Sequence, residues 1–200
     1  MNNLQHNTIG KAWRELVYLT KKNGVELADE GLELLDVNIK FKHDFNSKDT
    51  ILGKYADKKM IENMQKVFFS NEENDLGHSY FDNMCSPYRN DYLTDIVKVL
   101  KDKRNSKRAT LTLNSSGSGK VPCINVINFL IRDEKLNVYY FSRGQDAYKK
   151  FYADALVIAT MQSNIAEKLS VQVGEITGYI TSSHIYNSDM TSINNFLNND

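Results

Sequence analysis

The chain has 200 residues, the size of one domain, and its 25 lysines and arginines balance 25 aspartates and glutamates. A net charge of zero argues against a strongly basic nucleic-acid-binding protein, and only 10 glycines and 2 prolines exclude a linker-dominated chain. No apolar run approaches the ~20 residues of a membrane span, and the polar stretch 1–10 lacks the core of a signal peptide. The two cysteines, Cys85 and Cys123, make neither a disulfide framework nor a metal-spaced pair. We expect a single cytoplasmic domain over residues 1–200, with no membrane partner.

The first half of the chain predicts helices around one strand. Apolar residues recur at helical spacing from Ile9 to Val17, and Asn23-Gly24 supplies a stop signal. Over Leu35–Phe41 apolar and polar residues alternate, which predicts a half-buried strand. Two further helices are predicted over about Lys58–Phe69 and Asp91–Asp102, with a polar loop between them over 70–90.

The second half predicts a sheet covered by one long helix. Asp133-Glu134 separates two extended segments and predicts a tight hairpin turn. The long helix is predicted over Asp146–Leu169, and the Asn-rich end, Thr191–Asp200, is expected to be frayed. The extended segments are Arg108–Asn114, Val121–Arg132, Lys135–Arg143 and Glu175–Tyr186. The expected fold class is therefore α+β, with a mostly antiparallel twisted sheet covered by a long helix.

The Gly-rich stretch Ser115–Lys120 departs from a phosphate-binding Walker A loop. That motif needs glycine where Asn114 stands and serine or threonine where Val121 stands, and it opens a helix rather than a strand. We therefore expect a flexible hairpin loop. His78 and Cys85 share one predicted loop, but two potential ligands do not make a metal site, so no metal is expected.

Several polar residues of the second half each have an ordinary structural interpretation. A cysteine at the start of a strand, such as Cys123, is usually a small buried hydrophobe. Arg143 and Asp146, before the long helix, are typical of a solvated arginine and a capping acid. His184 and Tyr186 lie two apart on a predicted strand, so both side chains point to the same face, as a core histidine beside a tyrosine would.

In their order along the chain, these motifs resemble the thymidylate synthase and deoxycytidylate hydroxymethylase superfamily, and most of all its short archaeal and phage-type members. The resemblance extends from about Asp75 to Met190. Four motifs carry it, namely Asn105-Ser106-Lys107-Arg108, Val121-Pro122-Cys123, Arg143-Gly144-Gln145-Asp146 and His184-Ile185-Tyr186. It implies a thymidylate synthase-like fold, a sheet-mediated homodimer, a pyrimidine nucleoside monophosphate as substrate and 5,10-methylenetetrahydrofolate as the folate co-substrate.

The resemblance also implies a role for each matched residue. The Cys123 thiolate would add to C6 of the pyrimidine, so that C5 becomes the nucleophile that attacks the one-carbon unit. Lys107 and Arg108 match a basic pair that family dimers donate across the interface to the partner's nucleotide phosphate. The other matches are Arg143 with phosphate and cysteine, His184 and Tyr186 with the sugar 3′-hydroxyl, Asp146 with the pterin ring, and Tyr80 with an active-site tyrosine.

Asp154, the eighth residue after Asp146, stands where thymidylate synthases carry asparagine. An amide matches the N3–H donor and O4 acceptor of uracil, whereas a carboxylate accepts from the N4–H₂ group of cytosine. A carboxylate can also pair with N3 once that nitrogen is protonated, so Asp154 would both select the base and aid the chemistry. The ordinary alternative is an aspartate on the solvent side of the long helix. The neighbours Tyr152, Ala153, Ala155 and Leu156 favour the functional interpretation.

Three functions follow from these residues. The leading hypothesis is a hydroxymethylase of dCMP or CMP that uses methylenetetrahydrofolate and water. The runner-up is a thymidylate synthase acting on dUMP, in which folate also supplies hydride. A non-catalytic nucleotide-binding relative is the third, and a nucleic-acid-binding module has only the Lys101–Arg108 charge cluster in its favour, which a solvated helix end explains equally well.

Departures from the family pattern support the non-catalytic alternative. Gly144 replaces the usual phosphate-binding serine, and Lys107 replaces an arginine, keeping the charge without the bidentate fork. The family's catalytic glutamate lacks its usual aromatic motif here. We assign it to Glu62, with Glu72 and Glu73 as further candidates.

Overall fold

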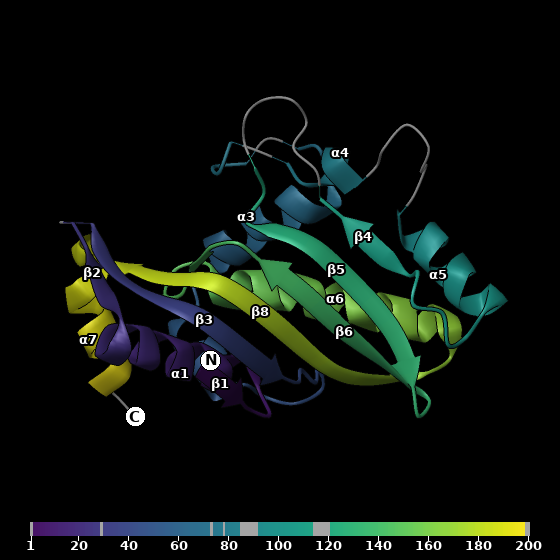
Figure 1. Ribbon diagram of the computed structural model, residues 1–200, viewed down its shortest axis with the longest axis horizontal. Helices are drawn as coiled ribbons and strands as arrows, with labels where there is room; N and C mark the ends of the chain where they lie inside the picture. The colour runs from purple at the N-terminus through teal and green to yellow at the C-terminus, as the bar shows by residue number, and fades with distance from the viewer. Residues whose placement is uncertain are drawn as a thin grey trace.

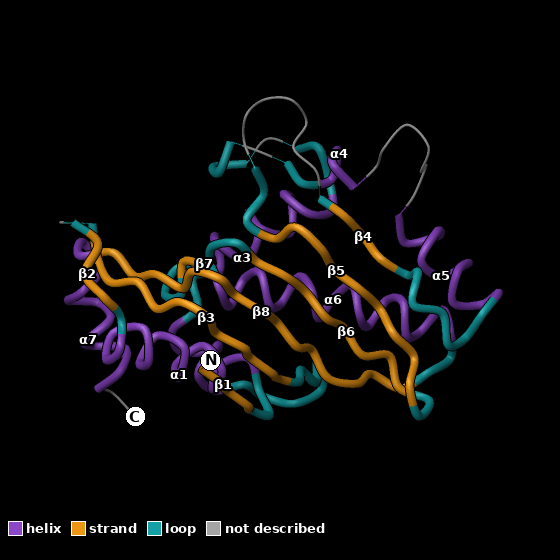
Figure 2. The backbone as a smooth tube through the Cα atoms, viewed as in Figure 1, coloured by secondary structure: helices purple, strands orange, loops and turns teal. Residues whose placement is uncertain are grey.

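The computed structural model describes residues 2–28, 30–72, 74–77, 79–84, 92–113 and 121–198. Within them one twisted sheet forms, and the long helix α6 (Phe151–Leu169) runs behind its central strands (Figure 1). Figure 2 shows the strands side by side as one continuous surface. The arrangement has the α+β character that the sequence predicted.

The elements follow one another closely along the chain. The strands are β1 (Asn2–Gln5), β2 (Val25–Leu27), β3 (Gly31–Phe41), β4 (Thr110–Thr112), β5 (Ile124–Arg132), β6 (Lys135–Ser142), β7 (Gln145–Asp146) and β8 (Gln172–Tyr186). The other helices are α1 (Ile9–Asn23), α2 (Thr50–Tyr55), α3 (Lys58–Phe69), α4 (Phe81–Met84), α5 (Tyr92–Asp102) and α7 (Met190–Asn198), and a 3₁₀ turn (Asn187–Asp189) precedes α7.

The sheet is mixed, which corrects the expectation of a mostly antiparallel one. Its strand order is β1-β3-β8-β6-β5-β4, with β2 beside β3 and β7 beside β8. The pairs β2–β3, β3–β8, β4–β5 and β5–β6 are antiparallel, whereas β1–β3, β6–β8 and β7–β8 are parallel. The parallel pairs arise because α1 and α6 carry the chain back along the sheet between β1 and β3 and between β6 and β8.

The hairpin between β5 and β6 is confirmed. Asp133 and Glu134 have φ values of 49° and 57°, the left-handed conformation that a two-residue hairpin turn with the right twist requires. The long helix is confirmed too, but it begins at Phe151 rather than Asp146. Asp146 lies in β7, and its carboxylate accepts hydrogen bonds from the Tyr148 and Lys149 N–H groups, which holds the chain in a turn before the helix.

The predictions for the first half are largely confirmed. Helix α3 has the predicted bounds, α1 ends at Asn23 as predicted, and α5 ends at Asp102, while Asp91 lies outside the described residues. The short elements β1, β2, α2 and α4 were not predicted, because three to six residues hold too few apolar positions to show a period.

The C-terminal segment is ordered up to Asn198, which corrects the expectation of a frayed end. Helix α7 buries Ile193 and Phe196, and the Phe196 ring lies 4.3 Å from the ring of Trp13 on α1. Polar asparagines dominate this sequence, but two apolar residues three apart suffice to fix one face of a short helix. Residues 199 and 200 lie outside the described part of the chain.

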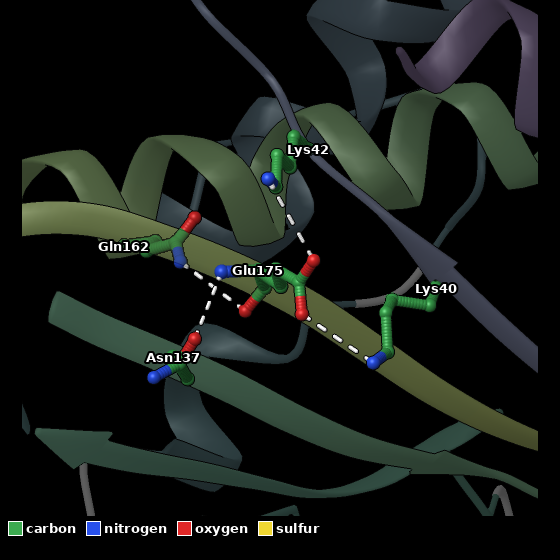
Figure 3. Close-up of polar contacts among 5 residues, drawn as sticks. All are labelled: Lys40, Lys42, Asn137, Gln162 and Glu175. Carbon is green, nitrogen blue, oxygen red and sulfur yellow. Dashed lines mark hydrogen bonds and ion pairs between the residues drawn. The ribbon is translucent and has the colours of Figure 1, made fainter. Parts of the chain in front are cut away.

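Polar contacts surround an irregularity in the pairing of β6 with β8, close to the turn of the β5–β6 hairpin. The register between β6 and β8 shifts between Leu136 and Val138. There Gln162 of α6 donates from Nε2 to the Leu136 carbonyl at 2.7 Å and to the Glu175 carbonyl at 3.5 Å. Figure 3 shows Asn137, which accepts from the Glu175 N–H at 3.0 Å, on the other side of that residue. The Glu175 carboxylate lies 3.4 Å from Lys40 and 3.7 Å from Lys42.

The two faces of the sheet differ in what covers them. The inner face packs against α1 and α6, and Val138, Tyr140 and Ile180 are buried there. On the opposite face Tyr139 is 46 % exposed and Phe141 38 %, and the Phe141 ring stacks on Tyr179 at 5.8 Å. Within the described residues, no helix combines the length and the apolar character needed to cross a membrane.

Candidate active site

Cys123 and Arg143 meet because β5 and β6 form a hairpin. Ile124 pairs with Ser142, so the residue before β5 and the residue after β6 lie side by side. The Arg143 N–H donates to the Cys123 carbonyl at 2.9 Å, and the Ser142 hydroxyl donates to the same oxygen at 3.2 Å. The hairpin thereby fixes the backbone that carries the thiol.

The Arg143 side chain lies along the segment that contains the thiol. Its Nε donates to the Pro122 carbonyl at 3.1 Å and its Nη2 to the Val121 carbonyl at 2.7 Å. The same Nη2 lies 3.9 Å from the Cys123 sulfur. A guanidinium that is always charged thus stands beside a partly exposed cysteine that is free of any disulfide. A Cβ at Gly144 would meet no atom within 4 Å, so the absence of the family's serine there has no steric cause.

Tyr80 contacts the backbone of Cys123 and lies within the electrostatic influence of Asp154. Its hydroxyl accepts a hydrogen bond from the Cys123 N–H at 3.2 Å, and its ring packs edge-on against Phe68 of α3. Burial raises the pKa of Tyr80, and the negative charges of Cys123 and Asp154 raise it further. The phenol is therefore neutral near pH 7 and keeps its proton available as a donor.

Asp154 lies in the first turn of α6 and is buried, with 7 % of its surface exposed. Its Oδ2 accepts a hydrogen bond from Nε2 of Gln145 at 2.8 Å. Burial raises the pKa of Asp154 to about 7, against the opposing effects of the Gln145 hydrogen bond and the Lys150 charge. Tyr140 of β6 is fully enclosed nearby, and its pKa is raised by burial and by the Asp154 charge. The position predicted to read the base is thus buried, not solvent-facing.

Asp146, His184 and Tyr186 form the adjoining part of the site. Strand β7 pairs Asp146 with His184 of β8, and the Ala147 N–H donates to the His184 carbonyl at 2.9 Å. The rings of His184 and Tyr186 stand edge to face at 5.3 Å, and both line a pocket of about 170 Å³. Partial burial and the charges of Asp146, Glu30 and Cys123 raise the pKa of Tyr186. His184 and Tyr186 lie on the same face, as the sequence predicted.

In the structure, Lys107 and Arg108 lie far from Cys123 of the same chain. Thr110 pairs with Asn128 and the Leu113 N–H donates to the Asn125 carbonyl, so Arg108 lies level with Leu130. Seven residues of strand separate that level from Cys123, which corresponds to about 20 Å. Both basic side chains are exposed and line a groove of about 630 Å³ with Lys103 and Asp102.

Glu62 lies on the exposed side of α3, whereas Met64, Val67 and Phe68 are buried. Among the described residues, no hydrogen bond or ion pair joins Glu62 to Cys123, Tyr80 or Asp154, and Glu72 is exposed as well. The role of Glu62 stays a prediction. Several other positions weighed in the sequence, namely Glu73, His78, Cys85 and Ser115–Lys120, lie outside the described residues.

Sequence reasoning missed three residues of this site. Gln145 lies inside the Arg143–Asp146 motif, but without a structure it has no assigned partner. Ser142 and Tyr140 alternate on the inner side of β6 and are both buried. The two-residue period of that strand places both residues on its buried face, together with Leu136 and Val138, and is the signal that could have marked them.

Comparisons with known proteins show which family this chain resembles. The family model described as "Thymidylate synthase" matches residues 5–200. A Methanothermobacter thermautotrophicus protein named "Putative thymidylate synthase" is 24 % identical over 205 residues, covering 92 % of each chain. The thymidylate synthase of Listeria innocua is 22 % identical, and the match covers 95 % of this chain and 62 % of that protein.

A solved structure shows the same fold. The thermostable thymidylate synthase A from Bacillus subtilis superposes with a TM-score of 0.72 and 14 % identity, over 97 % of this chain and 85 % of that one. The predicted thymidylate synthase-like fold is therefore confirmed. Because the family model matches almost the whole sequence, the chain belongs to the thymidylate synthase family.

Proposed function

We propose that the protein transfers a one-carbon unit to C5 of a pyrimidine nucleoside monophosphate, with Cys123 as the nucleophile. The observation that supports this most directly is the contact of Cys123 with Arg143 on one side and Tyr80 on the other. A buried carboxylate, Asp154, adjoins the same tyrosine. A nucleophile, a fixed positive charge and a candidate base-reading group thus lie around Cys123 and Tyr80.

Each step of the proposed reaction uses residues of this site. The Cys123 thiolate forms a bond to C6, and the electrons of the C5=C6 bond move to C5. C5 then attacks the one-carbon unit and loses its proton, and the bond between that unit and the folate nitrogen breaks, which leaves an exocyclic methylene group on C5. Hydride or water then adds to this methylene group, and the C6–S bond breaks to release the thiolate. Arg143 stabilises negative charge at the sulfur before attack and after release. Tyr80 holds the cysteine backbone while the sulfur changes its bonding.

Methylenetetrahydrofolate supplies the one-carbon unit when it is bound. Asp146 suits the pterin ring, because a carboxylate accepts from the N–H groups that this ring presents. Both hydrogen bonds that it accepts among the described residues fall on Oδ1, which leaves Oδ2 for a ligand. Burial raises the pKa of Asp146, and the two backbone N–H groups and the nearby His184 oppose that effect.

The acceptor base has two candidates, each with its own support. The names of the archaeal and bacterial relatives favour uracil, and hence synthesis of dTMP from dUMP with folate as the hydride donor. Asp154 in place of asparagine favours cytosine, and hence hydroxymethylation of dCMP or CMP by addition of water. The comparisons support thymidylate synthesis more strongly, and Asp154 is the reason to keep hydroxymethylation.

We propose further that the active unit is a homodimer formed by the exposed sheet face. Tyr139, Phe141 and Tyr179 form an apolar patch on that face. Lys107 and Arg108 lie about 20 Å along the sheet from their own Cys123. A second copy would cover the patch and place these two cations at the nucleotide phosphate of its partner.

The test is a product assay in which the purified protein receives methylenetetrahydrofolate and an equal mixture of dUMP, dCMP and CMP. Mass spectrometry distinguishes a methyl adduct on uracil from a hydroxymethyl adduct on cytosine. Dihydrofolate, seen as a rise in absorbance, accompanies only the methyl product. Cys123→Ala should abolish either product while the protein still binds nucleotide.

Each result has a separate meaning. A methyl product on dUMP establishes thymidylate synthesis, and a hydroxymethyl product on a cytosine nucleotide establishes hydroxymethylation. If no nucleotide gains mass and C5–H does not exchange with solvent, Cys123 is not a nucleophile, and the protein is a non-catalytic nucleotide binder.

A further inference from the structure

Gln145 has no role in the reaction proposed above, although it holds the residue that reads the base. We infer that Gln145 is a positioning and specificity-determining residue: its amide holds one oxygen of Asp154 and so sets the pH at which the pocket changes from accepting uracil to favouring cytosine. This inference rests on the proposed function, because it concerns the base that the same pocket binds.

Within the described part of the chain, one carboxylate oxygen of Asp154 has no hydrogen-bond partner. Oδ2 accepts from Gln145 Nε2 at 2.8 Å, and this is the hydrogen bond that the described residues provide to the carboxylate. Gln145 is 2 % exposed, so water competes little for its hydrogen bond to Asp154. Its own Oε1 is buried without a hydrogen-bond partner in the described part of the chain. A buried acceptor without a partner is costly, and a base N–H group is one donor that would relieve that cost.

The protonation state of Asp154 decides which base fits. A protonated carboxyl has one donor and one acceptor, the same pair as an amide, so it can pair with N3–H and O4 of uracil. A carboxylate has acceptors only, so it repels O4 of uracil but accepts from the N4–H₂ group of cytosine. Uracil therefore requires the proton on Asp154, whereas cytosine has a hydrogen-bonding partner in either state.

The surroundings of Asp154 bring this change into the physiological range. Burial raises the pKa of Asp154 to about 7, far above that of an exposed aspartate. The Gln145 amide and the Lys150 ammonium favour the charged form, and Asp146 opposes it. The titratable and charged groups that face the pocket from neighbouring elements are Tyr80, Cys123, Tyr140, Arg143, Asp146 and Lys150.

Gln145 controls the midpoint because its N–H group stabilises the carboxylate more than the acid. Without that donor the charged form loses its hydrogen bond, and the pKa of Asp154 rises further. Asp154 then stays protonated up to a higher pH, and the site can bind uracil up to that pH. If Gln145 only filled space in the core, replacing it would change the free energy of unfolding but would leave this midpoint unchanged.

The experiment compares Gln145→Met with the wild type by measuring the dissociation constants of dUMP and dCMP from about pH 5.5 to about pH 8.5. In the wild type, dUMP binding should weaken about tenfold per pH unit above a midpoint near the Asp154 pKa, because only the protonated fraction binds it. Binding of dCMP should change much less. Gln145→Met should move the midpoint upward by about one pH unit, the size expected for one lost charged hydrogen bond.

Gln162→Met is the matched control. Gln162 is also a buried glutamine, 1 % exposed, with an Nε2 bonded to a carbonyl and an Oε1 without a partner among the described residues. It lies beside Glu175, at the register shift between β6 and β8 (Figure 3). Its loss should lower stability to a similar degree and leave both pH profiles unchanged. Asp154→Asn should bind dUMP with no pH dependence in this range.

The outcomes separate this inference from the proposed function. If neither nucleotide binds at any pH, the proposed function fails. If both bind but Gln145→Met and Gln162→Met leave the same midpoint, or dUMP binding by the wild type does not fall with pH, the inference about Gln145 is wrong and the function stands. Should Gln145→Met fail to fold, Gln145→Glu keeps the shape, and its second carboxyl should also raise the midpoint.

Discussion

The burial of the Asp154 carboxyl makes the stability of the protein depend on pH. Its pKa of about 7 in the folded protein lies above the value of about 3.9 for an exposed aspartate. Between these values the native state binds more protons than the unfolded chain, so its stability falls as the pH rises from about 4 to about 7. The loss is complete above pH ~7, where both states are ionised.

Asp154→Asn should therefore stabilise the protein at about pH 8 and not at about pH 4. The substitution keeps the shape and cannot ionise, so the difference from the wild type should grow by up to about 4 kcal/mol across this range. Urea denaturation at several pH values measures it. Asp133→Asn, in the exposed hairpin turn, is the control and should show no such dependence. A constant difference across the pH range would mean that Asp154 does not stay protonated in the folded protein.

At the scale of elements, one carboxylate joins two helices. Asp49 accepts from the Gly10 N–H in the first turn of α1 at 2.7 Å and from the Leu52 N–H of α2 at 3.2 Å. Helix starts carry unpaired N–H groups, and an acidic side chain pairs with them and favours the helix dipole. A Cβ on Gly10 would lie 2.3 Å from the Asp49 Oδ1, so glycine is needed for this close approach.

Asp49→Ala should lower the free energy of unfolding by about 2 kcal/mol, because two helix starts lose their acceptor. Asp57→Ala removes an acceptor from α3 alone, where it takes the Lys59 N–H at 2.8 Å, and should cost about 1 kcal/mol. Chemical denaturation monitored by circular dichroism compares the two. Equal losses would show that the contact with Gly10 adds nothing.

Elements with a strong period were predicted well, and their ends less so. The bounds of α3 follow from its apolar spacing, and the β5–β6 hairpin from its alternation and its two-residue turn. The start of α6 was misplaced, because the Asp146 carboxylate bonds to two N–H groups of the intervening turn and delays the helix. The apolar spacing in the sequence continues across this turn, so the sequence pattern does not show where the helix begins.

At the scale of the whole molecule, the proposed dimer completes the site. Phe141→Glu places a charge in the apolar patch and should yield monomers that stay folded but lose activity. Light scattering after gel filtration measures the mass, and circular dichroism the fold. Tyr18→Glu, exposed on α1, is the control and should leave the dimer intact. A monomeric wild type with full activity would contradict the proposal.

Mixing variants tests whether the partner supplies Arg108. Arg108→Ala and Cys123→Ala should each be inactive alone. After unfolding and refolding together, half of the dimers are mixed and hold one complete site, so about a quarter of the wild-type activity should return. No recovery in confirmed mixed dimers would place Arg108 in the site of its own chain or outside the site altogether.

The sequence by itself predicted the thymidylate synthase family and the contact of Cys123 with Arg143, because a hairpin is a local structure defined by strand period and turn. Only the tertiary structure decided that the sheet is mixed, that the C-terminal helix packs on Trp13, and that Gln145 bonds to Asp154. These features depend on which other elements α6 and α7 pack against, and on which side chains that packing buries. Such contacts join elements whose own patterns do not specify their partners, so they emerge only when the chain packs as a whole.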